Sequence, residues 1–337
     1  MRAMRLLVTG AAGFIGSNFV HYWLERHPGD HVVAYDLLTY AGNRENLTGT
    51  EDRVPFVQGD IADLDLAEQT LREHDIEAVV NFAAESHNSL AVVDPGLFAR
   101  TNVLGTQLLL EAARRTSLSR FHHVSTCEVY GDLPLESEEL FSEESPYRPR
   151  TPYNASKAAA DHYVRAYHET YELPVTITNC SNNYGPFQFP EKVIPLFVTN
   201  ALDDKPLPMY ASTQNRREWL HVRDHCRAIE LALGEGAEGE TYNVGSGIEA
   251  SIEEIADRVL ELTGKPASLK TIVPDRPGHD RRYLLDSSKI QRELGWKPEI
   301  GFEDGLRETV EWYAANRAWW EPLRERLQVE ETAWTKS

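Results

Sequence analysis

Tyr153 and Lys157 lie one helical turn apart in the segment PYNASKAAADHY. That spacing places a phenol and an ammonium group on the same face of a helix. A cation beside a phenol favours the phenolate and lowers its pKa, so Tyr153 can act as a base toward an alcohol that is being oxidised. The predicted strand before this helix ends in Ser125 and Thr126, where a hydroxyl group can share the hydrogen bond of the substrate. Together these residues predict oxidation of a hydroxyl group.

A glycine-rich turn follows the first predicted strand. In TGAAGFIG the glycines stand at Gly10, Gly13 and Gly16, between a strand and a helix. A residue without Cβ lets the backbone approach a pyrophosphate, and the amino end of the next helix offers free N–H groups and partial positive charge. Strand, turn and helix in this order predict a dinucleotide site rather than a merely flexible turn.

Acidic residues after the next two predicted strands indicate which dinucleotide binds. Asp36 closes the second strand, at the spacing expected of a carboxylate that holds the adenosine ribose through its hydroxyl groups. A carboxylate there repels a ribose phosphate, which favours NAD over NADP. Asp60 and Ile61 follow the third strand and are expected to contact the adenine.

The elements that position these residues alternate along the first half of the chain. Short, unbroken apolar runs are typical of parallel strands buried on both faces, and helical segments separate them. Repeated strand–helix alternation implies right-handed crossovers and an α/β fold with a doubly wound parallel sheet of the Rossmann type. The strands are predicted at 5–10, 31–36, 54–60, 78–84, 121–126 and 175–180, and the helices at 17–26, 65–74, 101–115 and 155–171.

The pattern changes after Asn182, where turns rich in Pro and Gly separate shorter elements. Further helices are predicted at 251–263 and 302–316, and the residues from about Glu321 onward are expected at the periphery. We therefore predict an NAD-binding domain over residues 1–180 and a smaller α+β substrate lobe over residues 181–337. The boundary is approximate, because the chain can cross back between the two parts.

The overall charge limits the partners of the protein. With 53 acidic and 34 basic side chains, the formal net charge is −19. A uniform negative field repels phosphate, which argues against nucleic acids and anionic membranes as partners. If the substrate is itself a phosphate ester, basic groups are expected to gather locally in its pocket.

Cysteine content and the first residues indicate the compartment. Cys127, Cys180 and Cys226 are the three cysteines, and their spacing gives neither a disulfide framework nor a metal site. The first residues run directly into a strand without the features of a secretory signal, and no window is long and apolar enough to span a bilayer. We expect a soluble protein of the cytoplasm.

The motifs together resemble the extended short-chain dehydrogenase/reductase superfamily. Within it, DLLTYAGNRENL, NFAAESH, STCEVYG, NCSNNYGPFQFPEKVIP, REWLHVRDH and DRPGHDRRY are similar to segments of the dTDP-glucose 4,6-dehydratases, and the similarity covers nearly the whole chain. It implies tightly held NAD, a sugar-nucleotide substrate, and a homodimer built through a four-helix bundle. The expected NAD contacts are Gly10, Gly13, Phe14, Ile15, Gly16, Asp36, Thr39, Asp60, Ile61, Ala83, Thr101, Tyr153 and Lys157.

The resemblance also implies a reaction without net redox change. Tyr153 accepts the hydroxyl proton as hydride leaves C4 of the hexose for NAD, and the new ketone acidifies the hydrogen on C5. A carboxylate removes that hydrogen, an acid protonates the departing C6 hydroxyl, and hydride returns to C6. Glu128 stands at the position of the base. The expected catalytic residues are Thr126, Cys127, Glu128, Tyr153 and Lys157.

Cys127 departs from the family, which has an Asp as the acid at this position. An ordinary thiol has a pKa of about 8.5, so it is mostly protonated at neutral pH and can donate a proton. The other interpretation is an inert, small residue at a strand end. A group of sugar-nucleotide 5,6-dehydratases also carries Cys before Glu and returns hydride to C4, so a 5,6-alkene is the main alternative product.

Two further alternatives are a C4 epimerase and a non-catalytic relative that binds NAD as a sensor or scaffold. An epimerase has no need of Glu128, and a sensor has no need of Tyr153 and Lys157, so the retained residues favour elimination. A second departure from the family follows AAESH, where residues 88–92 read NSLAV and lack the usual Asp.

Local positive charge occurs in the motifs of the second lobe. Arg217 and Arg276 are the best anchors for a diphosphate, because Arg grips it through paired N–H bonds. Asn182 is expected to hold a phosphate or a sugar hydroxyl, and neither the base nor the exact hexose follows from the sequence. The expected substrate contacts are Ser86, His87, Thr126, Asn182, Lys192, Val193, Pro208, Tyr210, Arg217, Asn243, Arg276, His279 and Tyr283.

Overall fold

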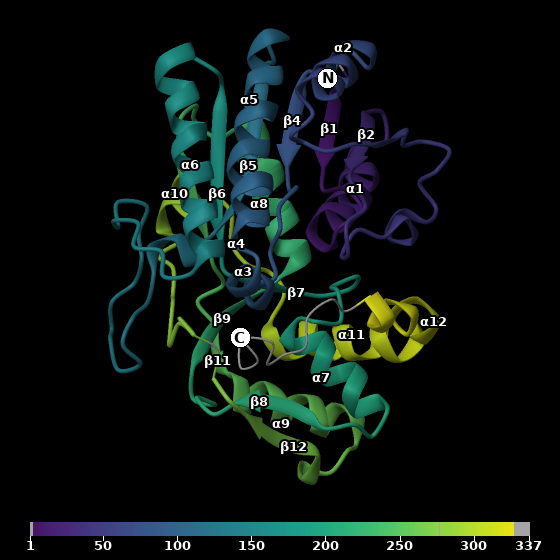
Figure 1. Ribbon diagram of the computed structural model, residues 1–337, viewed down its shortest axis with the longest axis vertical. Helices are drawn as coiled ribbons and strands as arrows, with labels where there is room; N and C mark the ends of the chain where they lie inside the picture. Colours follow the sequence, from purple (N-terminus) through teal and green to yellow (C-terminus); the bar gives the residue numbers. More distant parts are fainter. Residues whose placement is uncertain (1–2, 276, 327–337) are drawn as a thin grey trace.

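A seven-stranded parallel sheet forms the centre of the computed structural model, which describes residues 3–275 and 277–326. Its strand order is β10-β6-β5-β4-β1-β2-β3, with every neighbouring pair parallel. A smaller lobe lies beyond one end of the strands (Figure 1). The strands are β1 Arg5–Thr9, β2 His31–Asp36, β3 Phe56–Gln58, β4 Ala78–Asn81, β5 Arg120–Thr126, β6 Val175–Cys180 and β10 Thr241–Val244.

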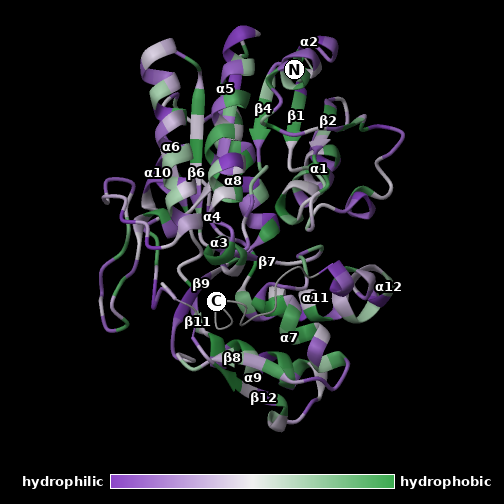
Figure 2. Cartoon of the chain, in the orientation of Figure 1, coloured by the Kyte–Doolittle hydropathy of each residue, from purple (hydrophilic) through white to green (hydrophobic). Residues whose placement is uncertain are grey.

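Both faces of the sheet are covered by helices, because successive strand residues point to opposite sides. Leu6 and Val8 of β1 pack with α1 and α8, whereas Leu7 packs with α2, α5 and α6 on the other face. In Figure 2, β1 and β4 are green, the colour of hydrophobic residues, whereas the helices around them contain both hydrophobic and hydrophilic residues. These helices are α1 Phe14–Arg26, α2 Leu64–Glu73, α5 Thr106–Arg115, α6 Pro152–Tyr171 and α8 Val222–Gly234.

The chain crosses back between the two parts. After residue 180 it builds part of the second lobe, and then β10 returns to the edge of the large sheet. There Asn243 lies opposite Asn179 of β6. The doubly wound α/β fold predicted from the sequence is confirmed, and its last strand comes from beyond the predicted boundary.

The second lobe has a hydrophobic core of its own. Phe197, Ile255, Leu306 and Tyr313, from three different helices, are completely buried in it. The lobe contains the sheets β11-β9-β7 and β12-β8. Its elements are β7 Asn182–Tyr184, α7 Val193–Leu202, β8 Leu207–Tyr210, β9 Arg216–His221, β11 Glu249–Ser251, α9 Ile252–Thr263, β12 Lys270–Val273, α11 Phe302–Ala315 and α12 Arg317–Trp320, whereas α10 Ser288–Leu294 packs beside β10 and α8 of the large sheet.

Two of the segments predicted from the sequence have other bounds or packing than expected. The helix expected at 101–115 begins earlier, as a π-helix η2 at Ala99–Gly105 that continues into α5, after the short helices α3 Asn88–Val93 and α4 Pro95–Phe98. The expectation that residues from Glu321 onward are peripheral is wrong for Leu323, which is 2% exposed. Arg324 forms an ion pair with Asp203, so this segment is held by both apolar and ionic contacts.

Within residues 3–275 and 277–326, no helix has the length and apolar character needed to cross a membrane. Over the same ranges, no group of three or more His, Cys, Asp and Glu side chains is placed to hold a metal ion. Cys127, Cys180 and Cys226 are buried free thiols.

Candidate active site

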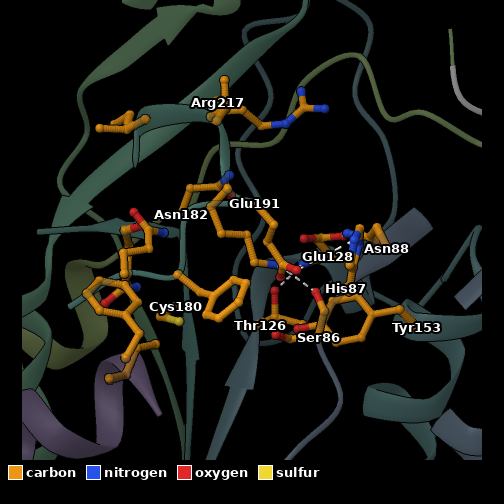
Figure 3. A pocket seen from close by; sticks show the side chains of 18 of the residues that line it. Ser86, His87, Asn88, Thr126, Glu128, Tyr153, Cys180, Asn182, Glu191 and Arg217 are labelled. Atoms are coloured by element: carbon orange, nitrogen blue, oxygen red, sulfur yellow. Dashed lines mark hydrogen bonds and ion pairs between the residues drawn. The ribbon is translucent and has the colours of Figure 1, made fainter. Parts of the chain in front are cut away.

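A cavity of about 460 Å³ lies where the carboxyl ends of β1, β4, β5 and β6 meet the second lobe. Ligands of open α/β sheets bind at this edge, because the loops there diverge and leave a crevice. Figure 3 shows Thr126, Glu128 and Tyr153 from the sheet side of the cavity, and Asn182 and Arg217 from the lobe side. The cavity therefore joins the two groups of residues that the sequence singled out.

The glycine-rich turn forms one wall of this cavity. Gly10 has a φ of +63°, and a Cβ at this position would lie 2.7 Å from the backbone nitrogen of Ala83. Gly13 precedes α1 and makes no side-chain cap, so the first N–H groups of the helix are available to a ligand. This space and these donors fit a pyrophosphate. The turn residues that line the cavity are Gly10, Gly13, Phe14, Ile15 and Gly16.

Asp36 ends β2 beside the turn. Its carboxylate accepts hydrogen bonds from the backbone N–H groups of Ala12, at 2.9 Å, and Leu38, at 2.7 Å. Burial raises the pKa of Asp36, and the two N–H donors oppose that rise. A second pocket next to it is lined by Leu38, Thr39 and Glu85 among others, so Thr39 is the one expected NAD contact in its wall.

Five residues expected at the NAD site line neither pocket: Asp36, Asp60, Ile61, Ala83 and Thr101. Asp60 forms an ion pair with Arg100 at 2.8 Å. Ile61 is 3% exposed and lies against Gly105, and Thr101 belongs to η2. Their contact with the dinucleotide stays a prediction.

Tyr153 and Lys157 come from the first turns of α6 and both line the cavity. The Lys157 ammonium donates to the carbonyl of Val124 at 2.8 Å and lies 3.4 Å from Nε2 of His123. Burial raises the pKa of Tyr153, the Glu128 carboxylate adds to the rise, and a hydrogen bond with Thr126 opposes it. In contrast to the prediction, burial rather than the neighbouring ammonium has the largest effect on the phenol.

Thr126, Cys127 and Glu128 lie where β5 passes into a 3-10 turn, η3 Cys127–Tyr130. The Thr126 hydroxyl accepts the N–H of Glu128 at 3.2 Å and so caps the turn. Successive side chains point in different directions, and only Thr126 and Glu128 of the three line the cavity. Asn88 donates to the Glu128 carboxylate at 3.3 Å, and Figure 3 shows these two side chains facing each other.

Cys127 does not stand where the prediction of a catalytic acid requires. It is 0% exposed and belongs to a hydrophobic cluster with Tyr130, Ala158 and Leu285. Burial raises the pKa of its thiol far above the ordinary value, and the Glu128 carboxylate adds to that rise. The thiol remains protonated but lies outside the cavity, so the interpretation as a packed, small side chain fits the structure better.

Most expected substrate contacts surround the cavity. The Asn182 side chain accepts the hydroxyl of Tyr283 at 2.7 Å, and Lys192 donates to the carbonyl of Ser86 at 2.7 Å. The Arg217 guanidinium lies 4.8 Å from the centre of the Tyr283 ring. The lining residues from that set are Ser86, His87, Thr126, Asn182, Lys192, Val193, Pro208, Tyr210, Arg217, His279 and Tyr283.

Asn243 does not line the cavity, and its contact with the substrate stays a prediction. Asn243 is 0% exposed in β10, and its side chain accepts the Tyr130 hydroxyl at 2.8 Å and donates to the carbonyl of Phe141 at 2.9 Å. Both ends of the amide are used inside the protein, where they tie η3 to the sheet. Arg276 lies outside the described residues.

Several polar side chains of the cavity wall are absent from the residues predicted from the sequence, among them Asn88, Glu191 and Asp280. Asn88 contacts Glu128, Glu191 accepts the Tyr40 hydroxyl at 2.8 Å, and Asp280 is 2% exposed. Glu191 and Asp280 stand within the segments NCSNNYGPFQFPEKVIP and DRPGHDRRY, so the motifs pointed to their neighbourhood without showing which side chains turn inward.

Comparison with known proteins agrees with this arrangement. The family model described as GDP-mannose 4,6 dehydratase matches residues 7–309. A dTDP-glucose 4,6-dehydratase of Streptomyces niveus is 51% identical over 95% of this chain and 96% of its own length. The dTDP-glucose 4,6-dehydratase 1 of Escherichia coli strain K12 is 47% identical, with 94% of each chain covered.

Solved structures extend the comparison to the fold. DesIV, a dTDP-glucose 4,6-dehydratase of Streptomyces venezuelae, has a TM-score of 0.92 at 50% identity, and the match covers 95% of this chain and all of DesIV. A UDP-glucose 4-epimerase of Thermotoga maritima has a TM-score of 0.87 at 30% identity, over 93% of this chain and 100% of the epimerase. The fold is thus shared by dehydratases and epimerases, whereas the higher identities are to dehydratases. By its motifs, fold and sequence identity, this chain belongs to the nucleotide-sugar 4,6-dehydratase family.

Proposed function

We propose that the protein is an NAD-dependent dTDP-glucose 4,6-dehydratase, which converts the glucose unit into a 4-keto-6-deoxy sugar and releases water. The observation that carries this proposal is that Tyr153, Thr126 and Glu128 face one cavity, which the glycine-rich turn also lines. An oxidation site and a carboxylate base are thereby brought to the same sugar. We take dTDP and glucose as the nucleotide and the hexose because the similar enzymes are named for this substrate.

The residues divide the reaction between C4 and C5. Tyr153, once it has lost its own proton, takes the proton of the C4 hydroxyl as the phenolate, and Thr126 holds the oxygen by a hydrogen bond. Bound NAD would accept hydride from C4 and later return it to C6. Once C4 is a ketone, Glu128 removes the acidified proton from C5, and the C6 hydroxyl departs as water.

In this proposal, residues of the second lobe bind the nucleotide. Arg217 is 6% exposed, and its guanidinium donates to the backbone carbonyls of Arg216 and Asp280 at 2.7 Å each. These bonds hold the cation at the cavity wall, where it attracts a diphosphate despite the acidic surface of the protein. The stacked ring of Tyr283 restricts it further.

Purified enzyme with dTDP-glucose tests the proposal. We expect a product lighter by one water, without net formation of NADH, by mass spectrometry and absorbance. A methyl doublet for C6 in the proton NMR spectrum supports 4,6-dehydration. An exocyclic alkene instead shows a 5,6-dehydratase, an inverted C4 shows an epimerase, and unchanged substrate contradicts an enzymatic role on this sugar nucleotide.

We also propose that the protein forms a homodimer and is located in the reducing cytoplasm. Leu104 of η2 and Tyr163 and Tyr171 of α6 are 47%, 43% and 51% exposed on helices that cover the sheet. Such side chains on neighbouring helices suit a bundle with a second copy of the chain. Light scattering on the purified protein measures the mass, and Leu104→Asp is expected to shift it toward the monomer.

A further inference from the structure

Loss of the C6 hydroxyl needs an acid, because hydroxide leaves poorly unless it is protonated as the C–O bond breaks. This step rests on the proposed function. Cys127, at the position where the family has its acid, packs against Tyr283 and Leu285 and is 0% exposed. The proton therefore has to come from another group of the cavity wall.

Asp280 is a buried carboxyl group in that wall. One of its oxygens accepts the side-chain N–H of Asn154 at 3.3 Å, and the other lies 3.5 Å from the Arg150 guanidinium. Its backbone carbonyl accepts from Arg217 at 2.7 Å. These contacts hold Asp280 between the amino end of α6 and the proposed diphosphate anchor.

Hydrogen bonds connect the position of Asp280 to that of the base. Thr151 caps α6 by accepting the N–H of Asn154 at 3.2 Å, and its hydroxyl donates to Asn88 at 3.4 Å. Asn88 in turn donates to Glu128 at 3.3 Å. Glu128 and Asp280 are thus anchored to the same helix end and line one cavity.

The charges around Asp280 favour its protonated form. Burial raises the pKa of Asp280 to about 7, and the Glu128 carboxylate adds to the rise, as does Asp132 more weakly. Arg217 and Arg150 oppose it. A carboxyl group that keeps its proton near neutral pH has the property that a general acid needs.

Two other acidic protons of the wall are already used within the protein. The Cys180 thiol donates to the carbonyl of Ser125 at 3.4 Å, and the Tyr283 hydroxyl donates to Asn182 at 2.7 Å. Asp280 instead meets two side-chain donors, Asn154 and Arg150, and lines the cavity.

We propose that Asp280, rather than Cys127, is the acid that protonates the C6 hydroxyl as it leaves. Glu128 breaks the C5–H bond, the electron pair forms the C5–C6 double bond, and the C6–O bond breaks as the oxygen takes the Asp280 proton and departs as water. Glu128 returns its proton to C5 when hydride reaches C6. The proton gained by Tyr153 balances the one lost by Asp280, and exchange with solvent resets both.

Asp280→Asn tests this assignment against dTDP-glucose in D₂O. We expect C4 oxidation and exchange of the C5 hydrogen for deuterium to continue, while loss of water falls about 100-fold or more. The 6-deoxy-6-fluoro analogue is the second substrate, because fluoride leaves without prior protonation. The variant is expected to release fluoride at a rate close to that of the wild type.

Cys127→Ala is the matched control, and it should keep water loss from dTDP-glucose within a few-fold of the wild type. Loss of C5 exchange and fluoride release together in Asp280→Asn would reveal a structural role and overturn the assignment. So would a collapse of water loss in Cys127→Ala with Asp280→Asn active. Wild-type protein that leaves dTDP-glucose unchanged would instead overturn the proposed function, and this acid assignment with it.

The pH profile gives an independent reading. Because the acid form of Asp280 is present below its pKa and lost above it, water loss from dTDP-glucose should decline as pH rises through about 7. Fluoride release should lack that decline. The same alkaline decline with both substrates would contradict the assignment.

Discussion

The two sides of the cavity are built in different ways. On the sheet side, Thr126, Tyr153 and Lys157 are fixed by a strand end and by the first turns of α6. On the lobe side, Arg217 lies on a short strand, whereas His279, Asp280 and Tyr283 come from an irregular segment between β12 and α10. The side chains of the sheet side thus come from regular elements, whereas those of the lobe side come from both a strand and an irregular segment.

On both sides of the cavity, burial changes the pKa of an ionisable side chain. Lys157 and Asp280 are both almost fully buried, at 4% and 2% exposure, and burial disfavours the charged form of each. Burial lowers the pKa of Lys157 and raises that of Asp280. Desolvation thus favours the neutral amine of Lys157 on the sheet side. On the lobe side it favours the protonated carboxyl group of Asp280.

Loss of the Tyr153 hydroxyl on the sheet side should have the largest effect on the reaction. We expect Tyr153→Phe to reduce C4 oxidation by about 1,000-fold, because general base catalysis is lost while the ring keeps its packing. A single-turnover measurement of reduced nicotinamide checks this. Tyr163→Phe, on the exposed face of the same helix, is the control and should behave as the wild type. Equal rates for the two variants would remove Tyr153 from the mechanism.

Glu128→Gln should separate the two chemical steps. We expect exchange of the C5 hydrogen and loss of water to fall by about 100-fold or more, whereas reduced nicotinamide still forms, since the amide cannot accept the C5 proton. Deuterium incorporation, measured by mass spectrometry, reports the first step. Glu138→Gln, an exposed acidic residue, controls for the change in charge. Undiminished C5 exchange would show that another group is the base.

Arg217→Lys, on the lobe side, should weaken substrate binding and leave the chemical steps almost unchanged. The ammonium keeps the charge but loses the paired N–H groups and the stacking on Tyr283, so we expect KM to rise about 10-fold with little change in kcat. Steady-state kinetics with dTDP-glucose provide the measurement. Arg216→Lys, the exposed neighbour, should leave KM unaltered. A fall in kcat at constant KM would place Arg217 in the chemical steps instead.

Asn88→Val should have the smallest effect. It removes the hydrogen bond to the Glu128 carboxylate and the acceptor of the Thr151 hydroxyl, so the base is held less firmly and C5 exchange should slow by about 3-fold to 10-fold. Thermal unfolding measured beside the kinetics separates this from a loss of folding. If C5 exchange is unchanged, the contact does not position the base.

The fold was largely predictable because its strands are buried on both faces. Continuous apolar runs mark such strands, and each of the six predicted strands overlaps an observed one, although 54–60 and 78–84 are longer than β3 and β4. The strand β10 escaped prediction because it is short and contains the polar pair Tyr242 and Asn243. Its place is set by pairing with β6, which is distant in sequence.

The site was predictable where a residue's direction follows from a regular element. Tyr153 and Lys157 share a helix face by their spacing, and Gly10 lies in the turn that strand and helix enclose. Cys127 and Glu128 are neighbours in sequence, yet a 3-10 turn sends one into a hydrophobic cluster and the other into the cavity. A motif alone does not distinguish these two directions.

The sequence by itself determined the alternation of strands and helices, the dinucleotide turn and the family, because these depend on local spacing and on residue types. Tertiary structure alone decided that Cys127 does not line the cavity, that Asn243 is hydrogen-bonded inside the protein, and that Asp280 lines the same cavity as Glu128. The physical reason is that burial and charge interactions depend on which distant segments pack together, and those set the protonation state on which catalysis depends.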